Sequence, residues 1–265
     1  MLSEQSLRDG QLQQALEQLQ DQIRKKPAEP EPRIFLFQLL TVLGQWQRAL
    51  NQLNVIGGLD AGTLPMVQTY RQAIACELLR EQVFAGQRAP LVFGDPAQWI
   101  ALLLEALRLT ASGDHARAEA VRNQAFEQAP AAGGTVNDQP FAWLADADVR
   151  LGPVLEALIN GQYYWIPFDR IASLTLEPPS DLRDLVWLPG QFTWTNGGQV
   201  VGLLPARYPG STDSDDPQIK LGRKTDWQQY GENTFLGLGQ KMLATDQGEF
   251  ALFDIRSLTL AAADG

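Results

Sequence analysis

Residues Gly10–Pro27 read GQLQQALEQLQDQIRKKP, and the spacing inside this stretch predicts how the first half of the chain folds. One apolar stripe runs along it in steps of i, i+4, i+7 and i+11, formed by Leu12, Leu16, Leu19 and Ile23. Pro27 cannot continue a helix because it lacks a backbone N–H. The stretch therefore predicts an amphipathic helix that follows a turn at Gly10 and stops before Pro27.

Two further stretches carry the same spacing between a glycine and an alanine. Each glycine precedes its alanine by five residues, in the pairs Gly10 and Ala15, Gly44 and Ala49, and Gly113 and Ala118. The first two glycines lie 34 residues apart, the period of tetratricopeptide repeats, and the third follows 69 residues later, two periods plus one. Glycine permits the tight turn between paired helices, and alanine lets the two helices approach closely.

The match to the repeat is incomplete. Pro27 and Pro130 each follow their glycine by 17 residues, whereas Ala61 stands at that place in the second repeat. The segment Met66–Gly86 lacks the glycine–alanine spacing. The pattern favours a tetratricopeptide-like module, and an ordinary helical bundle with chance glycines is the alternative. The expected helices are Leu12–Ile23, Arg33–Leu43, Gln45–Leu53 (ended by Gly57-Gly58), Met66–Phe84, Ala97–Thr110 and Ala116–Gln128.

The second half of the chain has the composition of a β-rich domain. Ala131–Pro140, AAGGTVNDQP, is rich in glycine, proline and small polar residues and is the expected linker. Five of the seven tryptophans follow it, in segments rich in β-branched and aromatic residues. Asn196–Gly198 and Asp246–Glu249 are expected to turn two hairpins. The expected strands are Tyr163–Phe168, Ala172–Leu176, Val186–Thr195, Gln199–Pro205, Gln240–Thr245 and Phe250–Ile255, with one helix near Pro153–Asn160.

These patterns together predict an α+β chain with two parts. Residues 1–135 form the tetratricopeptide-like helical module, and residues 136–265 form a mainly antiparallel β-rich module with one or two helices. Within the second part, the segment Pro209–Pro217, PGSTDSDDP, is expected to be an exposed acidic loop.

Net charge and the length of the apolar runs exclude two classes of partner. The formal net charge is −10, with −3 on residues 1–140 and −7 on the rest, so the surface repels phosphate backbones and we expect no nucleic acid partner. The longest apolar runs, such as Ile34–Leu40, are far shorter than a membrane span, and the N-terminus is too polar for a signal peptide. Cys76 is the only cysteine, so no disulfide can form within the chain. We expect a cytoplasmic protein without membrane insertion.

The titratable residues give little indication of catalysis. His115, the only histidine, lies in a turn and has no histidine or cysteine within ligand spacing. Cys76 lies in an apolar helical stretch, which is typical of a buried thiol. Asp146 and Asp148 form an Asp-x-Asp pair of the kind that binds a divalent cation, but Arg150 follows at once and favours ion pairing. We therefore expect no catalytic residue, no metal and no cofactor, with a divalent-metal-dependent enzyme using Asp146 and Asp148 as the alternative.

Aromatic residues are the remaining signal for binding. Four aromatic residues cluster around Ile166-Pro167: Tyr163, Tyr164, Trp165 and Phe168. Aromatic residues at this density usually fill a core, and they are also the residues that anchor partners, so both interpretations stay open. The candidate partner-binding residues are Phe37, Trp143, Tyr163, Tyr164, Trp165, Arg170, Trp187 and Tyr208.

Four runs in the second half resemble a known family. They are WLADADVRLGPVLEALINGQYYWIPFDRI (Trp143–Ile171), LEPPSDLRDLVW (Leu176–Trp187), LLPARYPGS (Leu203–Ser211) and LGQKMLATDQGEFALFDIR (Leu238–Arg256). Together with the glycine–alanine repeats, they are similar to the ImpE/TagJ family, also called SciE-type proteins. The resemblance is densest after Trp143, and before it the chain matches mainly in its helical pattern.

This resemblance implies a function that composition and spacing do not reveal. Members of the family are cytoplasmic accessory proteins of type VI secretion in Gram-negative bacteria, associated with the contractile sheath. The resemblance implies a non-catalytic adaptor that binds the small sheath subunit through that subunit's N-terminal helix. Such an adaptor would modulate sheath assembly or disassembly, with the sheath-disassembling AAA+ ATPase as a second candidate partner. A scaffold or chaperone for unassembled sheath subunits is the alternative, and a helix laid in an apolar groove is the expected binding mode.

Overall fold

The computed structural model describes residues 2–95 and 97–261, and it has an α+β fold in which helices come first and strands follow. The six helices expected in the first half of the chain are all present, with ends shifted by a few residues. The described part of the chain also contains four short 3-10 turns, Ala61–Thr63, Phe168–Arg170, Ser211–Asp213 and Leu252–Asp254. The helices are α1 (Leu2–Arg8), α2 (Leu12–Lys25), α3 (Pro30–Val42), α4 (Trp46–Leu59), α5 (Leu64–Phe84), α6 (Gln98–Ala111), α7 (His115–Gln128) and the short α8 (Pro217–Lys220).

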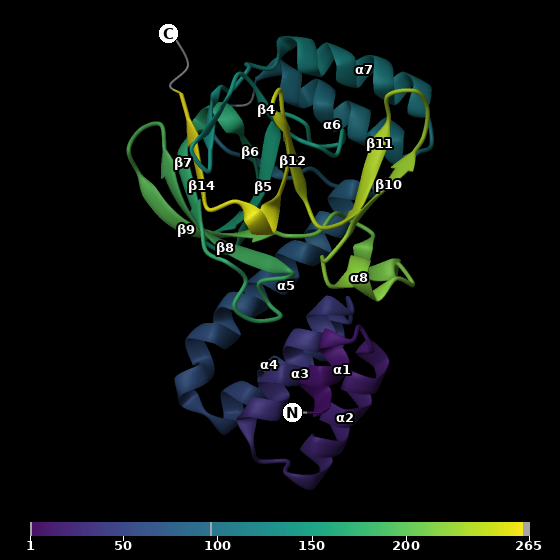
Figure 1. Ribbon diagram of the computed structural model, residues 1–265, viewed down its shortest axis with the longest axis vertical. Coiled ribbons are helices and arrows are strands. Elements are labelled where there is room, and N and C mark those ends of the chain that lie inside the picture. The colour runs from purple at the N-terminus through teal and green to yellow at the C-terminus, as the bar shows by residue number, and fades with distance from the viewer. Residues whose placement is uncertain (1, 96, 262–265) are drawn as a thin grey trace.

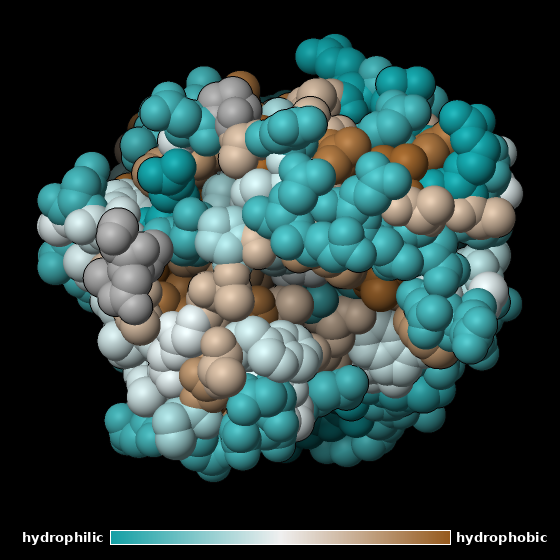
Figure 2. All heavy atoms as spheres, turned by 90° about the horizontal axis from the view of Figure 1, so that it is seen from above, coloured by the Kyte–Doolittle hydropathy of each residue, from teal (hydrophilic) through white to brown (hydrophobic). Residues whose placement is uncertain are grey.

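The helices are divided between two lobes (Figure 1). In Figure 1, α1 to α4 form the lower lobe, while α6 and α7 lie over the top of the sheets in the upper lobe. The long helix α5 runs from the lower lobe into the upper one. Seen from above, the upper lobe is covered mostly by hydrophilic residues, and hydrophobic residues gather toward the middle of that face (Figure 2).

The glycine–alanine spacing has the physical basis that the sequence predicts. Gly10, Gly44 and Gly113 join α1 to α2, α3 to α4, and α6 to α7, with φ angles of +75°, +68° and +83°. These angles lie in the left-handed region that favours glycine. The three alanines that follow are completely buried between their helices: Ala15, Ala49 and Ala118.

The β-rich part contains one large sheet and two small ones. The large sheet has nine strands in the order β1-β6-β5-β9-β8-β7-β14-β2-β3, and every pair is antiparallel except β1 with β6. The strands are β1 (Leu91–Val92), β2 (Gly134–Val136), β3 (Gln139–Phe141), β4 (Leu144–Asp146), β5 (Val154–Ile159), β6 (Gln162–Pro167), β7 (Ile171–Leu176), β8 (Trp187–Trp194), β9 (Gln199–Pro205), β10 (Thr225–Gln229), β11 (Phe235–Gly239), β12 (Met242–Thr245), β13 (Gly248–Ala251) and β14 (Ser257–Leu260).

Three details differ from the sequence-based expectations. The segment Pro153–Asn160 contains strand β5 rather than a helix, and all six residues of β5 are buried. A short apolar run that is covered on both faces has no periodicity to distinguish strand from helix. Ala131–Pro140 is not a free linker, because β2 pairs with both β14 and β3. Gly57-Gly58 does not end α4, which continues to Leu59.

One hydrophobic core runs through both lobes. It includes residues of all the long helices and continues into the β-rich part through Tyr163, Trp165 and Trp187. The Trp187 ring lies 6.0 Å from Trp46 and 5.8 Å from Tyr70, measured between ring centroids. A second core lies within the sheets. In the part of the chain that the structure describes, no helix is long and apolar enough to cross a membrane.

Candidate functional site

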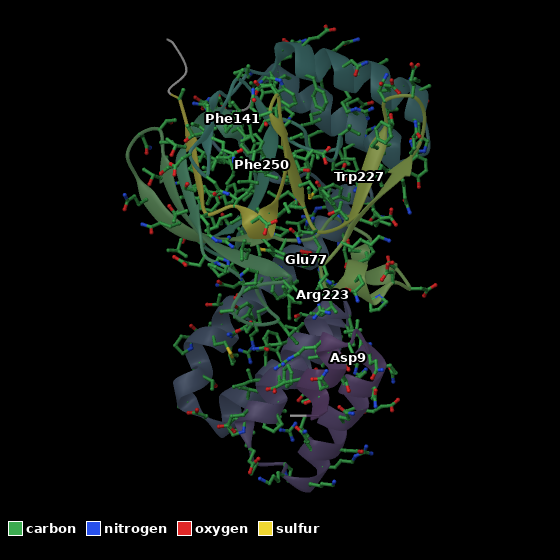
Figure 3. All side chains as sticks on the ribbon, in the orientation of Figure 1. Asp9, Glu77, Phe141, Arg223, Trp227 and Phe250 are labelled. Atoms are coloured by element: carbon green, nitrogen blue, oxygen red, sulfur yellow. The ribbon has the colours of Figure 1, made fainter. Side chains whose placement is uncertain are left out.

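The junction between the lobes holds a cluster of buried charges. We call Glu77, Arg80, Asp146, Glu156 and Lys241 the ionic cluster, and each of these residues is at most 7% exposed. Helix α5 supplies the first two, β4 and β5 supply the next two, and the residue before β12 supplies the lysine. Glu77 is labelled at this junction in Figure 3. The ionic cluster therefore ties α5 to the β-rich part.

Glu156 lies at the centre of the ionic cluster. Its carboxylate accepts hydrogen bonds from Arg80 at 2.6 and 2.9 Å and lies 2.7 Å from the Lys241 Nζ. Burial alone would raise the pKa of the Glu156 carboxyl, but Arg80 and Lys241 hold it well below its usual range. Burial raises the pKa values of Glu77 and Asp146, even though Arg80 and Lys241 favour their charged forms.

Asp146 and Asp148 are engaged within the protein. Asp148 binds the Arg150 side chain, with Nε 2.9 Å from Oδ1, and also accepts a hydrogen bond from a backbone N–H of β11 at 2.8 Å. Asp146 accepts hydrogen bonds from Lys241 Nζ and the Tyr208 hydroxyl, both at 2.9 Å. Among the described residues, no group of three or more His, Cys, Asp or Glu side chains is placed to hold a metal ion. Asp148 thus pairs with Arg150, as the sequence favours, whereas Asp146 pairs with Lys241.

His115 and Cys76 also lie in structural surroundings. The His115 ring stacks on Tyr230 at the start of α7, with 4.5 Å between ring centroids. The Cys76 thiol donates to the carbonyl oxygen of Gly161 at 3.3 Å, and burial raises its pKa to about 11. A thiol with so high a pKa stays protonated at neutral pH and is a weak nucleophile.

The eight candidate partner-binding residues divide into a buried set and an accessible set. The buried set is at most 1% exposed, so a partner could reach it only by opening the core: Phe37, Tyr163, Trp165, Trp187 and Tyr208. The accessible set consists of Trp143, Tyr164 and Arg170, with Trp143 43% exposed. Tyr164 and Arg170 both lie beside the loop after β1, at one edge of the large sheet. Trp143 follows β3, at the opposite edge, so the structure does not bring the three together.

A large apolar opening lies elsewhere, beside the junction of the lobes. We call it the α1–α3 groove; its volume is about 750 Å³. Its apolar walls come from α1, from the start of α3 and from the loop between β7 and β8: Leu7, Pro32, Ile34, Phe35, Leu182 and Leu185. Polar and charged residues surround them: Glu4, Arg8, Gln22, Glu29, Glu31, Gln38, Ser180, Asp181 and Arg223.

Hydrogen bonds fix the walls of the groove in place. The backbone N–H and the hydroxyl of Ser180 both donate to the Asp184 carboxylate, at 2.7 and 2.9 Å. Arg183 lies over the Tyr70 ring, 5.0 Å from its centroid, which holds the β7–β8 loop against α5. Arg223 donates to the carbonyl oxygens of the last residues of α1 at 3.0 and 3.3 Å, and Figure 3 shows it between the two lobes. The groove is thus walled by both lobes.

None of these groove residues is among the candidates that the sequence predicts. Ile34 and Phe35 belong to a run that is apolar nearly all round, which predicts burial on every side, yet both remain partly exposed. Leu182 and Leu185 lie in a polar loop, and their spacing within LRDL was the one signal that could have marked them. Two leucines at this spacing in a loop indicate a groove only when the fold is known to place α3 opposite them.

The chain is an α+β protein whose N-terminal helices and antiparallel sheet share one hydrophobic core. The crystal structure of protein VPA1032 from Vibrio parahaemolyticus has this fold, with a TM-score of 0.90, 28% sequence identity and 98% of both chains covered. A sequence model of the ImpE protein family matches residues 138–259. The type VI secretion system accessory component TagJ of Pseudomonas aeruginosa is 54% identical over 264 residues, covering 100% of this chain and 92% of that protein. The chain belongs to the ImpE/TagJ family of type VI secretion accessory components, which confirms the resemblance seen in its sequence.

Proposed function

We propose that the chain is a non-catalytic cytoplasmic adaptor that binds the N-terminal helix of the small sheath subunit in the α1–α3 groove. The observation that carries the proposal is the groove itself, an apolar opening of about 750 Å³ at the junction of the lobes. Helix-in-groove recognition needs an apolar channel that accepts side chains at i, i+3, i+4 and i+7. The similarity to TagJ, an accessory component of type VI secretion, supports a partner that belongs to this secretion system.

The fixed walls of the groove support tight binding. Binding is weakened by the conformational entropy that both partners lose. A groove that is already ordered in the free protein loses less of this entropy when the helix binds. The β7–β8 loop is held by Asp184 and by the contact of Arg183 with Tyr70, and α1 is held by Arg223. The groove would therefore receive a helix without having to form around it.

Other features support finer parts of the proposal. The three helical hairpins with glycine turns and buried alanines support a tetratricopeptide-like helical part, and such repeats present continuous grooves. The accessible residues Trp143, Tyr164 and Arg170 lie outside the groove, at opposite edges of the large sheet, and either edge would stay open to the sheath-disassembling ATPase. A chaperone for unassembled sheath subunits could use the same groove. It would differ from the adaptor by binding free subunits and not assembled sheath.

A peptide titration tests the proposed function. We expect a peptide copying the N-terminal helix of the cognate small sheath subunit to bind, and Phe35→Ala to weaken binding about 30- to 1,000-fold because an aromatic anchor is lost. Trp143→Ala is the matched control, since it removes an accessible aromatic residue far from the groove. Both variants must keep the wild-type melting curve. Loss of binding in Trp143→Ala with none in Phe35→Ala would place the partner outside the groove, and no binding to wild type by peptide or subunit would refute the adaptor function.

A further inference from the structure

The α1–α3 groove has a defined direction relative to the fold. Arg223 and Arg207, both from the β-rich part, bind backbone carbonyls at the C-terminal ends of α1 and α3; Arg207 donates to the Val42 oxygen at 2.8 Å. Both helices therefore run toward the β-rich part. The lining residues follow α3 from Glu29 to Gln38, which corresponds to about 14 Å of helix. The groove is long enough for two to three turns of a partner helix.

The two ends of the groove carry opposite charges. Glu29 and Glu31 lie at the N-terminal end of α3, and Glu31 forms no ion pair within the described residues, while Glu29 lies 2.7 Å from Lys26. Arg8 lies in the last turn of α1, next to Arg223, at the end close to the β-rich part. The groove is also lined by Glu4, one turn before Arg8 in α1, and by Asp181, which pairs with Arg183. The far end is thus acidic, and Arg8 and Arg223 make the near end the more basic of the two.

We propose that this charge arrangement selects the partner helix and sets its direction. The occupant is an amphipathic helix with acidic residues in its first turn and basic residues in its last turn. It lies antiparallel to α1 and α3, with its first turn at Arg8 and its last turn at Glu31. This inference rests on the proposed function, because it specifies which helices the same groove accepts.

Two electrostatic effects favour this direction. The acidic first turn meets Arg8, and the basic last turn meets Glu31 and Glu29. An antiparallel helix also places its positive end beside the C-terminal ends of α1 and α3, which are negative. The reverse direction loses both effects and sets like charges against each other.

Two stapled peptides with the same apolar stripe test the proposal. One has Glu in the first turn and Lys in the last, the other has the charges exchanged, and the staple makes both equally helical. We expect the first to bind wild-type protein about five- to tenfold more tightly at low salt by fluorescence anisotropy, with the difference vanishing near 1 M salt. The double variant Arg8→Glu, Glu31→Lys should reverse the preference. A photo-crosslinker at the N-terminus of the first peptide should label Arg8 and its neighbours, not Glu29–Glu31.

The outcomes separate this inference from the proposed function. If both peptides bind equally and Phe35→Ala weakens both, the groove binds helices but its charges do not select them, and the inference is wrong. If neither designed peptide binds while the sheath helix peptide does, the inference is wrong and the proposed function stands. Self-association of the protein that is lost in Phe35→Ala would mean that a second copy covers the groove, which also overturns the inference.

Discussion

Gly44 illustrates how one residue fixes both a turn and the junction between the lobes. Its φ of +68° is left-handed, and a Cβ atom there would lie 2.7 Å from the Cβ of Thr212 in the β-rich part. We expect Gly44→Ala to lower the free energy of unfolding by about 2–4 kcal/mol, from backbone strain and the clash together. Gly113→Ala is the matched control: φ is +83° but no atom lies within 4 Å of the added Cβ, so we expect a loss of only about 1–2 kcal/mol. Equal losses in urea unfolding would show that Thr212 moves aside freely.

Glu156 is a second residue whose substitution should lower the free energy of unfolding. Glu156→Gln leaves Arg80 and Lys241 buried without their shared anion, so we expect the free energy of unfolding to fall by about 3–5 kcal/mol at pH 7. Glu105→Gln is the control, because Glu105 pairs with Arg108 in solvent and we expect a change below about 1 kcal/mol.

The pH dependence of this effect has a definite sign. The folded pKa of Glu156 is lowered, so its contribution is present above the unfolded value of about 4.3 and is lost as the pH falls toward the folded value. Glu77 and Asp146 have raised pKa values and act in the opposite sense, since their charged forms cost stability as the pH rises. We expect wild type to lose stability as the pH falls from about 4.5 to about 3, and Glu156→Gln to remove part of this loss. Urea unfolding at several pH values measures this, and parallel curves for wild type and variant would contradict it.

At the scale of the element, helices were predicted better than strands. The repeat glycines and the apolar stripes are local signals, and the hairpin turns at Asn196–Gly198 and Asp246–Glu249 also depend only on neighbours. Strand β5 was mistaken for a helix because its six buried residues show no alternation. The composition of β2 and β3 predicts a linker, because β2 is held in the sheet by β14, more than a hundred positions away, and β3 pairs with β2.

The division into modules 1–135 and 136–265 stays a proposal. Because the two parts share a core, we expect each to depend on the other for its stability. Trp187 packs against Trp46 and Tyr70, and the ionic cluster joins α5 to β5, so each piece alone would expose apolar and charged surface. We expect the two pieces, coexpressed, to co-purify as one complex, and each alone to unfold at lower temperature than the whole chain. Two stable pieces that do not bind each other would contradict the shared core.

At the scale of the whole molecule, the family could be predicted from the sequence, but the site could not. The ordered runs after Trp143 identified the family, and Asp148 does pair with Arg150 as expected. The aromatic candidates were mostly core residues, because burial and partner binding favour the same side chains. The groove forms only where α1, α3 and the distant β7–β8 loop meet at the junction of the lobes. A local sequence pattern cannot predict such a meeting.

Amide hydrogen exchange with the sheath helix peptide tests the location of the binding site most directly. We expect added protection in α1, in residues 29–38 of α3 and in residues 179–185 of the β7–β8 loop, because these segments form the walls of the groove. Segments around Trp143, Tyr164 and Arg170 should exchange as in the free protein. Phe35→Ala should abolish the added protection at the same peptide concentration. Protection confined to the surroundings of Trp143, Tyr164 or Arg170, with α1 and α3 unchanged, would contradict the claim that the α1–α3 groove is where this protein binds its partner.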